Sequence, residues 1–242
     1  FKIYWLRFRN SATKFKSNCQ KVFFKNMVKK LSYILYQIIS FFDKFFYLIT
    51  KKSFLVWFKD FIEEDSYKFI KILDKKINFF IPNQVTKWRV DTYFLKEPET
   101  LEWIESFKSE KKIIFWDIGS NIGLYSIYAA LKHTNIEIIS FEPSTSNLRV
   151  LSRNISINNL ENKIKICQIP LTDKSNEFQM MNEEHFIEGS ALNSFGKNED
   201  FEGKIFSPIT KYQLFGTSIN SLIDNNILKT PNYIKIDVDG IE

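Results

Sequence analysis

Acidic residues that could bind a ligand or move a proton stand at the ends of four apolar, strand-like runs. They are Asp117, Glu142, Asp173 and Asp237. Because the carboxyl ends of parallel strands meet at one edge of a sheet, we expect these carboxylates to gather around one crevice. Carboxylates in a crevice accept hydrogen bonds from ligand hydroxyl and ammonium groups, or remove a proton from a reacting hydroxyl. The spacing therefore predicts a ligand site rather than four unrelated surface acids.

A glycine-containing turn follows the first of these runs, in the segment KKIIFWDIGSNIG at residues 111–123. The wholly apolar run from Ile113 to Trp116 is typical of a central parallel strand that is covered on both faces. Gly119 and Gly123 allow the backbone to turn sharply and to approach a ligand closely. Apolar residues then continue at helical spacing. A strand, a glycine loop and a helix N-terminus together predict a cofactor cradle.

The order of the acids suits a cationic sulfonium cofactor, S-adenosylmethionine. Such a cofactor needs one carboxylate near its amino acid end and another at its ribose. We expect Asp117 to orient the methionine ammonium through the loop, and Gly119 and Gly123 to admit the cofactor backbone. Glu142 stands 23 residues beyond Gly119, where nucleotide-binding folds place a carboxylate on the ribose hydroxyls. Asp173 is the candidate partner of the adenine amine.

An NAD-dependent dehydrogenase is the main alternative, because a glycine turn with an acid about twenty residues later is also its signature. The pattern G-x-G-x-x-G is absent, since position 121 is Asn and only Gly119 and Gly123 remain. This difference argues against NAD as the cofactor.

Asp237 and Asp239 are the candidate catalytic residues if a sulfonium cofactor transfers its methyl group to a hydroxyl. The reaction is an in-line displacement, so the protein must hold an acceptor oxygen about 3 Å from the methyl group and help to remove its proton. Asp237 is the best placed base, because it ends the last strand and faces the same crevice as Asp117. Asp239 and Glu242 follow as alternative bases or substrate ligands, or as an acid cluster that favours a helix N-terminus. His185 stands alone in an acidic loop, which is more typical of a surface histidine.

The elements that must position these residues alternate between strand and helix patterns. Strand patterns occur at residues 113–117, 137–141, 164–169 and 233–238. Helix patterns follow the glycine loop and occur at 147–158 and 218–228, with a polar, glycine-containing loop before the last helix. This alternation predicts an α/β fold with a doubly wound, mostly parallel sheet.

The first eighty residues differ in composition from the rest of the chain. They contain 17 of the 34 Lys and Arg residues but only 6 of the 28 acidic residues. Apolar residues at helical spacing from Leu31 to Ile49 predict a long amphipathic helix, and residues 51–80 continue the helical pattern. We therefore expect a basic, aromatic-rich helical N-terminal region at 1–80, a lead-in segment at 81–110 and the cofactor-binding α/β domain at 111–242.

Two partners are open for the N-terminal region, a membrane surface and the rest of the protein. The longest charge-free run, Leu31 to Phe42, is shorter than the about 18 apolar residues that span a membrane. Residues 1–60 could instead make peripheral contact with anionic lipid through their Lys-rich and Phe-rich surfaces. No nucleic-acid-binding motif accompanies the positive charge, so we expect no nucleic-acid partner.

The lead-in segment predicts a short strand or an extended segment at residues 88–94 and a helix that begins near Pro98, where early acids favour a helix N-terminus. Cys19 and Cys167 lie far apart and without metal-ligand spacing, so we expect neither a disulfide nor a metal site. Free thiols suit a reducing compartment, and we expect a cytoplasmic protein.

Several motifs together resemble the FkbM family of S-adenosylmethionine-dependent methyltransferases. They are DIGSNIGLYSIYAA, ISFEPS, the turn Leu171-Thr172-Asp173 and the final YIKIDVDGIE. The family pattern D-x-G-A-N-x-G is met with Ser120 in place of Ala. The pattern I-D-V-E-G-A-E is met with Asp239 in place of Glu and Ile241 in place of Ala. The resemblance covers roughly residues 82–242.

The resemblance implies a Rossmann-like class I methyltransferase fold, and Asn121 of the first motif joins the expected cofactor contacts. It implies O-methylation of a hydroxyl on a sugar, a lipid or another small-molecule acceptor. It also implies a seven-stranded sheet, of which the sequence predicts four strands, so we expect the chain to be incomplete at its C-terminus. Residues 1–80 lie outside the resemblance. A non-catalytic, membrane-associated binding module is a further alternative.

Overall fold

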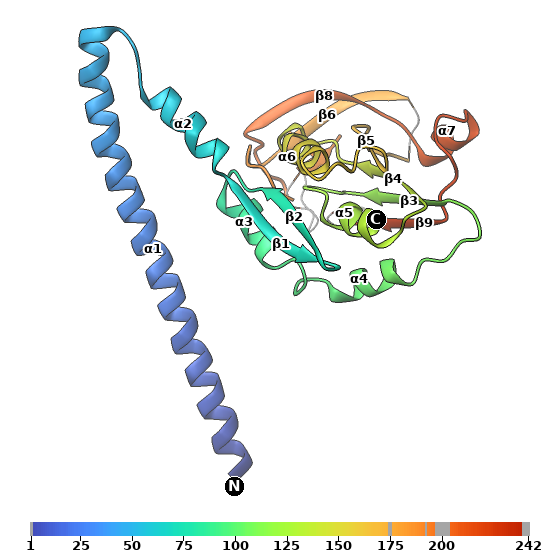
Figure 1. The fold of residues 1–242 in the computed structure, drawn as a ribbon, viewed down its shortest axis with the longest axis horizontal. Helices are drawn as coiled ribbons and strands as arrows, with labels where there is room; N and C mark the ends of the chain where they lie inside the picture. The colour runs from blue at the N-terminus through green and yellow to red at the C-terminus, as the bar shows by residue number, and fades with distance from the viewer. Residues whose placement is uncertain (1, 174–175, 192, 197–203, 239–242) are drawn as a thin grey trace. The chain divides into compact units, whose positions relative to one another are not determined.

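The computed structural model describes residues 2–173, 176–191, 193–196 and 204–238, with side chains from residue 26 onward (Figure 1). The chain divides into two compact units, residues 1–65 and residues 66–242. The first unit consists of helices, and the second unit carries the sheets.

Two helices form the first unit: α1 spans Lys2–Thr50 and α2 spans Leu55–Glu64. Asp43 of α1 connects them through hydrogen bonds to the start of α2. Its carboxylate accepts from Ser53 Oγ at 2.8 Å and from the backbone N–H groups of Phe54 and Leu55 at 2.7 and 3.0 Å. These bonds satisfy donors that the first turn of a helix leaves without an intrahelical partner.

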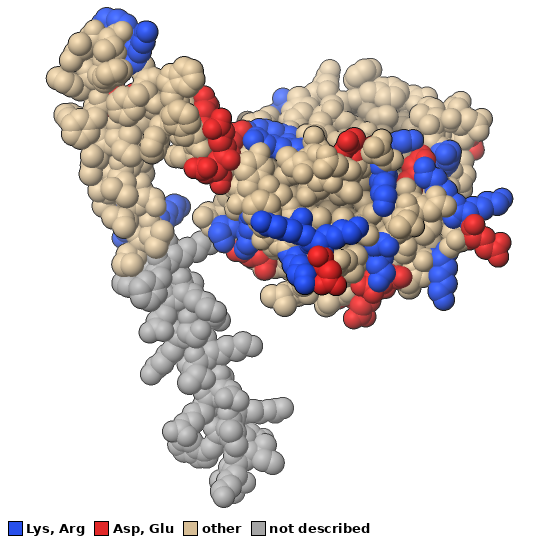
Figure 2. Space-filling model, viewed as in Figure 1, with Lys and Arg blue, Asp and Glu red and all other residues tan. Residues whose placement is uncertain are grey.

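The described apolar side chains of α1 and α2 are largely exposed. Phe41, Leu48 and Trp57 are examples, and Figure 2 shows mostly uncharged side chains over α2 and the described part of α1, with acids gathered at the end of α2. The helix predicted from Leu31 to Ile49 is confirmed as part of α1. In the described part of the chain, no helix is both long and apolar enough to cross a membrane.

A β-hairpin opens the second unit, so the helical prediction for residues 66–80 is wrong. β1 spans Tyr67–Ile72 and pairs antiparallel with β2, which spans Lys75–Phe80. Leu73 and Asp74 form the turn with positive φ angles of 47° and 63°, as a two-residue hairpin turn requires. Ile72, Ile77, Phe79 and Phe80 are buried in the core of this unit, so the helical N-terminal region ends near residue 65.

Two short helices follow the hairpin. α3 spans Gln84–Asp91 and α4 spans Pro98–Glu105. Asn83 caps α3, because its side chain accepts from the backbone N–H groups of Val85 and Thr86 at 2.8 and 3.0 Å. The strand predicted at residues 88–94 is therefore wrong, since a capped helix already includes Trp88 to Asp91. α4 begins at Pro98 as predicted.

The central sheet contains four parallel strands in the order β5-β4-β3-β9. β3 spans Ile113–Ile118, β4 Ile136–Phe141, β5 Ile164–Cys167 and β9 Tyr233–Ile236. The four predicted strands are confirmed, although β5 and β9 end two residues earlier than predicted. α5 spans Leu124–Lys132, α6 Thr145–Ser156 and α7 Ile219–Asp224.

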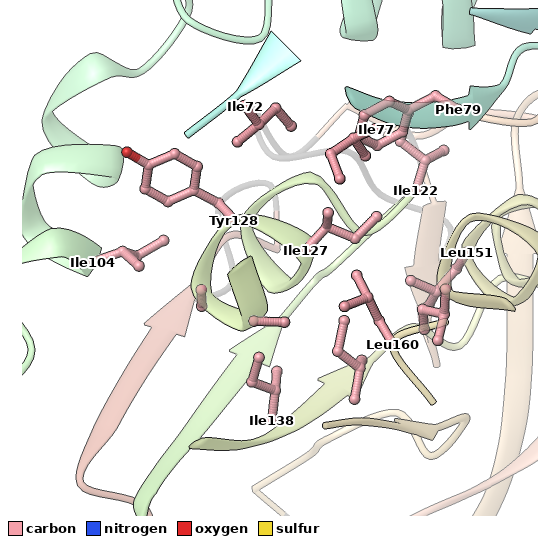
Figure 3. Packing of buried hydrophobic residues seen from close by; sticks show 14 of the residues in the cluster. Ile72, Ile77, Phe79, Ile104, Ile122, Ile127, Tyr128, Ile138, Leu151 and Leu160 are labelled. Carbon is pink, nitrogen blue, oxygen red and sulfur yellow. The ribbon is translucent and has the colours of Figure 1, made fainter. Parts of the chain in front are cut away.

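Side chains of β3 pack on both faces of the sheet. Ile113 and Phe115 belong to the larger cluster of buried residues, to which α5, α6 and the hairpin contribute (Figure 3). Ile114 and Trp116 belong to a second cluster with Leu222 of α7. Because both faces are covered, the strand is apolar from Ile113 to Trp116, and the predicted doubly wound α/β fold is confirmed.

A three-stranded antiparallel sheet replaces most of the polar loop that the sequence predicts before α7. β6 spans Glu177–Glu183, β7 Asn193–Phe195 and β8 Thr210–Gly216, in the order β7-β6-β8. A parallel bridge between Leu171 and Thr217 connects the start and the end of this segment beside the central sheet. The loop prediction is wrong here because the strand pairs are distant in sequence and their residues are largely polar.

Candidate functional site

A cavity of about 350 Å³ lies at the carboxyl ends of β3, β4 and β9. Its volume falls within the range of about 300–1,000 Å³ that is usual for small-molecule sites. Met181, Asn193 and Phe195 of the antiparallel sheet contribute another part of its wall. The cavity therefore has the position that open α/β sheets use for ligand binding.

Gly119 places the loop after β3 against the end of β9. Its φ angle is +77°, and a Cβ atom at this position would lie 1.9 Å from the carbonyl oxygen of Asp237. Gly123 has a φ angle of +86° and begins α5, and a Cβ atom there would lie 2.6 Å from Leu151 Cδ1. Gly119 lines the cavity, whereas Gly123 is not among the lining residues and shapes the loop from behind.

Glu142 connects the glycine loop to the turn after β4 and lines the cavity. Its Oε2 accepts from the backbone N–H of Asn121 at 2.7 Å, and its Oε1 accepts from the backbone N–H of Ser144 at 2.9 Å. Burial raises the pKa of Glu142 to about 7, although these hydrogen bonds lower it. The carboxyl group is thus held in one orientation at the cavity wall.

Asn121 lines the cavity beside Glu142, with a positive φ angle of 50°. Its Nδ2 donates to the carbonyl oxygen of Ser190 at 2.9 Å, and Asn147 Nδ2 donates to the same oxygen at 3.0 Å. Asn121 Oδ1 is buried and has no hydrogen-bond partner among the described residues. The Gly189-Ser190 turn is therefore fixed beside the glycine loop, and Asn121 Oδ1 can accept a hydrogen bond from a ligand.

Asp117 lies behind the cavity wall rather than on it, and its role in orienting the methionine ammonium through the loop stays a prediction. The side chain is fully buried and is not among the lining residues. Its Oδ2 accepts from Ser126 Oγ of α5 at 2.6 Å, so the carboxylate faces α5. Its Oδ1 lies 3.5 Å from Lys235 Nζ. The pleat of β3 directs this side chain away from the cavity.

Lys235, which the sequence analysis missed, stands between two predicted site acids. Its side chain is 7% exposed, and its Nζ lies 3.2 Å from Asp237 Oδ2 as well as 3.5 Å from Asp117 Oδ1. The ammonium also lies 4.9 Å from the centre of the Tyr125 ring. Burial lowers the pKa of Lys235, but the two carboxylates raise it more, and the net shift is upward. A charged residue inside the otherwise apolar run YIKI was the available signal.

Asp237 lines the cavity directly after β9. Its backbone N–H donates to the carbonyl oxygen of Ile118 at 3.1 Å, and its side chain is 44% exposed. Asp173 lines another part of the cavity and accepts from Thr172 Oγ1 at 3.2 Å. The predicted catalytic residue Asp239 lies outside the described residues. The structure thus brings Glu142, Asp173 and Asp237 to one cavity.

Two cations also line the cavity, Arg89 of α3 and Lys96 just before α4. Sequence analysis missed both, because nothing in the lead-in segment marks a basic residue as facing a ligand. His185 is exposed and is not a lining residue. Among the described residues, no group of three or more His, Cys, Asp or Glu side chains could hold a metal ion.

Residues 117–242, about half of the chain, match the family model described as the methyltransferase FkbM domain. The chain belongs to the FkbM methyltransferase family. The matched range begins at Asp117 and includes the glycine loop, Glu142 and Asp237. The resemblance inferred from the motifs is therefore confirmed.

A curated relative of this FkbM chain is the methyltransferase sdnD of Sordaria araneosa, with 37% identity over 59 residues. The aligned part is 24% of this chain and 23% of the relative, so the chain spans about a quarter of the relative's length.

Two solved structures are similar to part of the chain. A SAM-dependent methyltransferase from Agrobacterium tumefaciens has 13% identity and a TM-score of 0.31, over 43% of this chain and 32% of that chain. The C-terminal domain of precorrin-6Y C5,15-methyltransferase from Rhodobacter capsulatus has 22% identity and a TM-score of 0.27, over 30% and 39%. Both TM-scores lie below 0.5, so we assign the fold from the strand order and the family match.

Proposed function

We propose that this FkbM chain binds S-adenosylmethionine and methylates a hydroxyl group of a small molecule, such as a sugar or a lipid. The position of Glu142 supports the proposal most directly. Two backbone N–H groups orient its carboxyl group at the cavity wall, and each carboxylate oxygen can accept a further hydrogen bond. Ribose hydroxyls are donors of the kind that this carboxylate would bind.

Other cavity residues fit the remaining parts of the cofactor. Gly119 leaves room for a close approach to the loop backbone, and Asn121 Oδ1 is a buried acceptor without a partner among the described residues. Phe141, Leu171 and Asp173 offer an apolar wall with one carboxylate, which suits an adenine ring and its amine. The bound cofactor would supply an electrophilic methyl group.

Asp237 is the residue that would remove the proton of the acceptor hydroxyl. It lines the cavity, its side chain is partly exposed, and Lys235 holds one of its oxygens at 3.2 Å. One oxygen of this carboxylate is held by Lys235 while the side chain remains partly exposed to the cavity, so it can accept a proton and keep its orientation. No other carboxylate of the described lining lies at the end of β9.

Titration calorimetry with S-adenosylmethionine, its demethylated product S-adenosylhomocysteine and NAD tests cofactor choice. We expect the two sulfur compounds to bind and NAD not to bind. Glu142→Gln should weaken S-adenosylhomocysteine binding by about 1–3 kcal/mol, the usual cost of losing a charged hydrogen-bond partner. Glu161→Gln, at an exposed position outside the cavity lining, is the matched control. Binding of NAD alone would instead favour a dehydrogenase.

Transfer of a labelled methyl group to a panel of sugar and lipid hydroxyls tests the reaction. Asp237→Asn should abolish transfer while leaving S-adenosylhomocysteine affinity within about threefold of the original, because the amide keeps the side-chain size but accepts no proton. A chain that binds the cofactor but transfers no methyl group to any acceptor would support the binding-module alternative.

Peripheral membrane contact by residues 1–60 is a separate part of the proposal, as is a cytoplasmic location. Exposed aromatic side chains on α1 and α2 support lipid contact.

A further inference from the structure

A small second lobe of the cavity lies between the α3–α4 segment and the glycine loop. Its volume is about 30 Å³, and it shares Arg89, Lys96, Gly119, Asn121 and Asp237 with the main cavity. A cavity needs about 10–15 Å³ of such volume to hold one water molecule. The lobe therefore accepts a group of two or three heavy atoms rather than a nucleoside. Both cations of the cavity wall therefore border a space of carboxylate size.

The charges of the cavity wall are divided between two regions. Glu142 and Asp173 line the main cavity but not the lobe, whereas Arg89 and Lys96 line both. Among the described acids, Asp237 lines both the main cavity and the lobe. A ligand that follows this division would carry hydroxyl or amine donors at one end and an anionic group at the other.

Arg89 is fixed at the lobe by the fold around it. It belongs to the capped helix α3, and its Nε donates to the carbonyl oxygen of Gly189 at 2.6 Å. Asn83 Nδ2 donates to the carbonyl oxygen of Glu188 at 3.0 Å, which holds the same turn against the start of α3. A guanidinium group oriented in this way is preorganised for an anion, because it loses little freedom on binding.

Lys96 approaches the lobe from the other side and is less constrained. Its Nζ pairs with Glu97 Oε1 at 2.9 Å, and Glu97 Oε2 accepts from Tyr125 Oη at 2.7 Å. Tyr125 itself lines the lobe. The ammonium is therefore kept near the lobe by an acid that is tied to α5, although the side chain is 46% exposed.

We propose that Arg89 and Lys96 form an anion subsite for the carboxylate at the amino acid end of the cofactor. The inference rests on the proposed function, because that function places the ribose of the cofactor at Glu142. The amino acid end of the cofactor would then pass Gly119 and reach the lobe. Arg89 is the main contact, because its guanidinium can bind both carboxylate oxygens and is more buried than Lys96. A carboxylate on the acceptor is the other source of the same chemistry.

Three ligands that differ at one end test the subsite by calorimetry. S-adenosylhomocysteine has the full amino acid end, its decarboxylated form keeps only the ammonium, and 5′-methylthioadenosine has neither. We expect the original protein to bind S-adenosylhomocysteine at least about tenfold more tightly than the decarboxylated form, as a charge-assisted pair implies. Arg89→Met should remove that preference, and Lys96→Met should reduce it by about threefold.

The variants have matched controls. Lys87→Met removes a cation of the same helix that pairs with Asp91 on the surface, and it should change none of the three affinities. Arg89→Lys should keep part of the preference, because it retains the charge. Circular dichroism melting shows whether Arg89→Met still folds, and Lys96→Met tests the subsite independently because its side chain is exposed.

The outcomes separate the subsite from the proposed function. Equal loss for all three ligands in Arg89→Met, or no loss in either variant, would overturn the subsite while cofactor binding stands. If Arg89→Met leaves the S-adenosylhomocysteine preference intact but raises the KM of a carboxylated acceptor, the carboxylate belongs to the acceptor and the cofactor assignment is wrong. If the original protein binds none of the three ligands, the proposed function and the subsite both fall.

Discussion

Replacing Lys235 by Met should destabilise the second unit by about 3–5 kcal/mol, the usual effect of removing one partner of a buried ion pair. Asp117 is fully buried, and its Oδ1 has no hydrogen-bond partner among the described residues, so the charge of Lys235 at 3.5 Å is its main compensation. With an effective dielectric constant of about 20, two unit charges at this distance attract by about 5 kcal/mol.

Urea denaturation followed by near-ultraviolet circular dichroism measures this effect. The matched control is Lys71→Met, because Lys71 pairs with Asp74 at the shorter distance of 2.7 Å but both side chains are more than two-thirds exposed. We expect a loss of less than about 1 kcal/mol for this control, since water screens exposed pairs. Burial, not distance, should decide which lysine matters.

The double variant Asp117→Asn with Lys235→Met tests the cause. If the cost of Lys235→Met comes from the unpaired charge of Asp117, the double variant should lose less unfolding free energy than the two single variants lose in sum. We expect a difference of at least about 1 kcal/mol. Additive losses, or a Lys235→Met protein within 1 kcal/mol of the original, would refute the assignment of a buried ion pair.

Three further predictions concern the site and the N-terminal unit. Gly119→Ala should abolish S-adenosylhomocysteine binding in calorimetry, because the added Cβ would lie 1.9 Å from the Asp237 carbonyl oxygen; unchanged affinity would show that the loop can move. Burial raises the pKa of Glu142 from 4.5 to about 7. Between these pH values the folded state holds a proton that the unfolded state has lost. The contribution of Glu142 to stability should therefore fall as the pH rises from about 4.5 to 7. Denaturation curves at several pH values should show this fall in the original protein but not in Glu142→Gln, and ligand affinity should rise over the same interval as the carboxylate forms. Deleting residues 1–65 should remove salt-sensitive binding to anionic vesicles and leave cofactor affinity unchanged, and equal sedimentation with vesicles before and after deletion would end the lipid-contact proposal.

The central sheet and its glycine loop could be predicted from sequence because their signals are local. Strands β3 and β4 carry mostly apolar side chains on both faces, and the loop between β3 and α5 needs glycine at two positive φ angles. The hairpin at 67–80 gave a weaker signal, because Leu73 and Asp74 adopt positive φ angles without the glycine that usually marks such a turn. The antiparallel sheet was missed because the strands that pair across it, such as β6 and β8, are far apart in sequence.

Which face of a strand a terminal acid occupies could not be predicted from its position alone. Asp117 and Glu142 both follow apolar runs, yet Asp117 points toward Ser126 of α5 whereas Glu142 lines the cavity. The difference comes from where each strand ends relative to its pleat, because successive side chains alternate between faces. Lys235 was missed for a related reason. Its partner Asp117 lies opposite it in the register of β3 and β9, and that register exists only in the folded sheet.

The end of β9 couples the cofactor cradle to the proposed base. The carbonyl oxygen of Asp237 fills the space that a side chain at Gly119 would need, its N–H bonds to Ile118, and its carboxylate pairs with Lys235. A change at Gly119 would therefore displace the base as well as the cradle. Glu142 is held instead by the backbone N–H groups of Asn121 and Ser144, at the end of β4, and among the described residues it makes no hydrogen bond to β9. Changes at Glu142 should accordingly alter cofactor affinity without displacing the base, whereas changes at Gly119 should alter affinity and methyl transfer together.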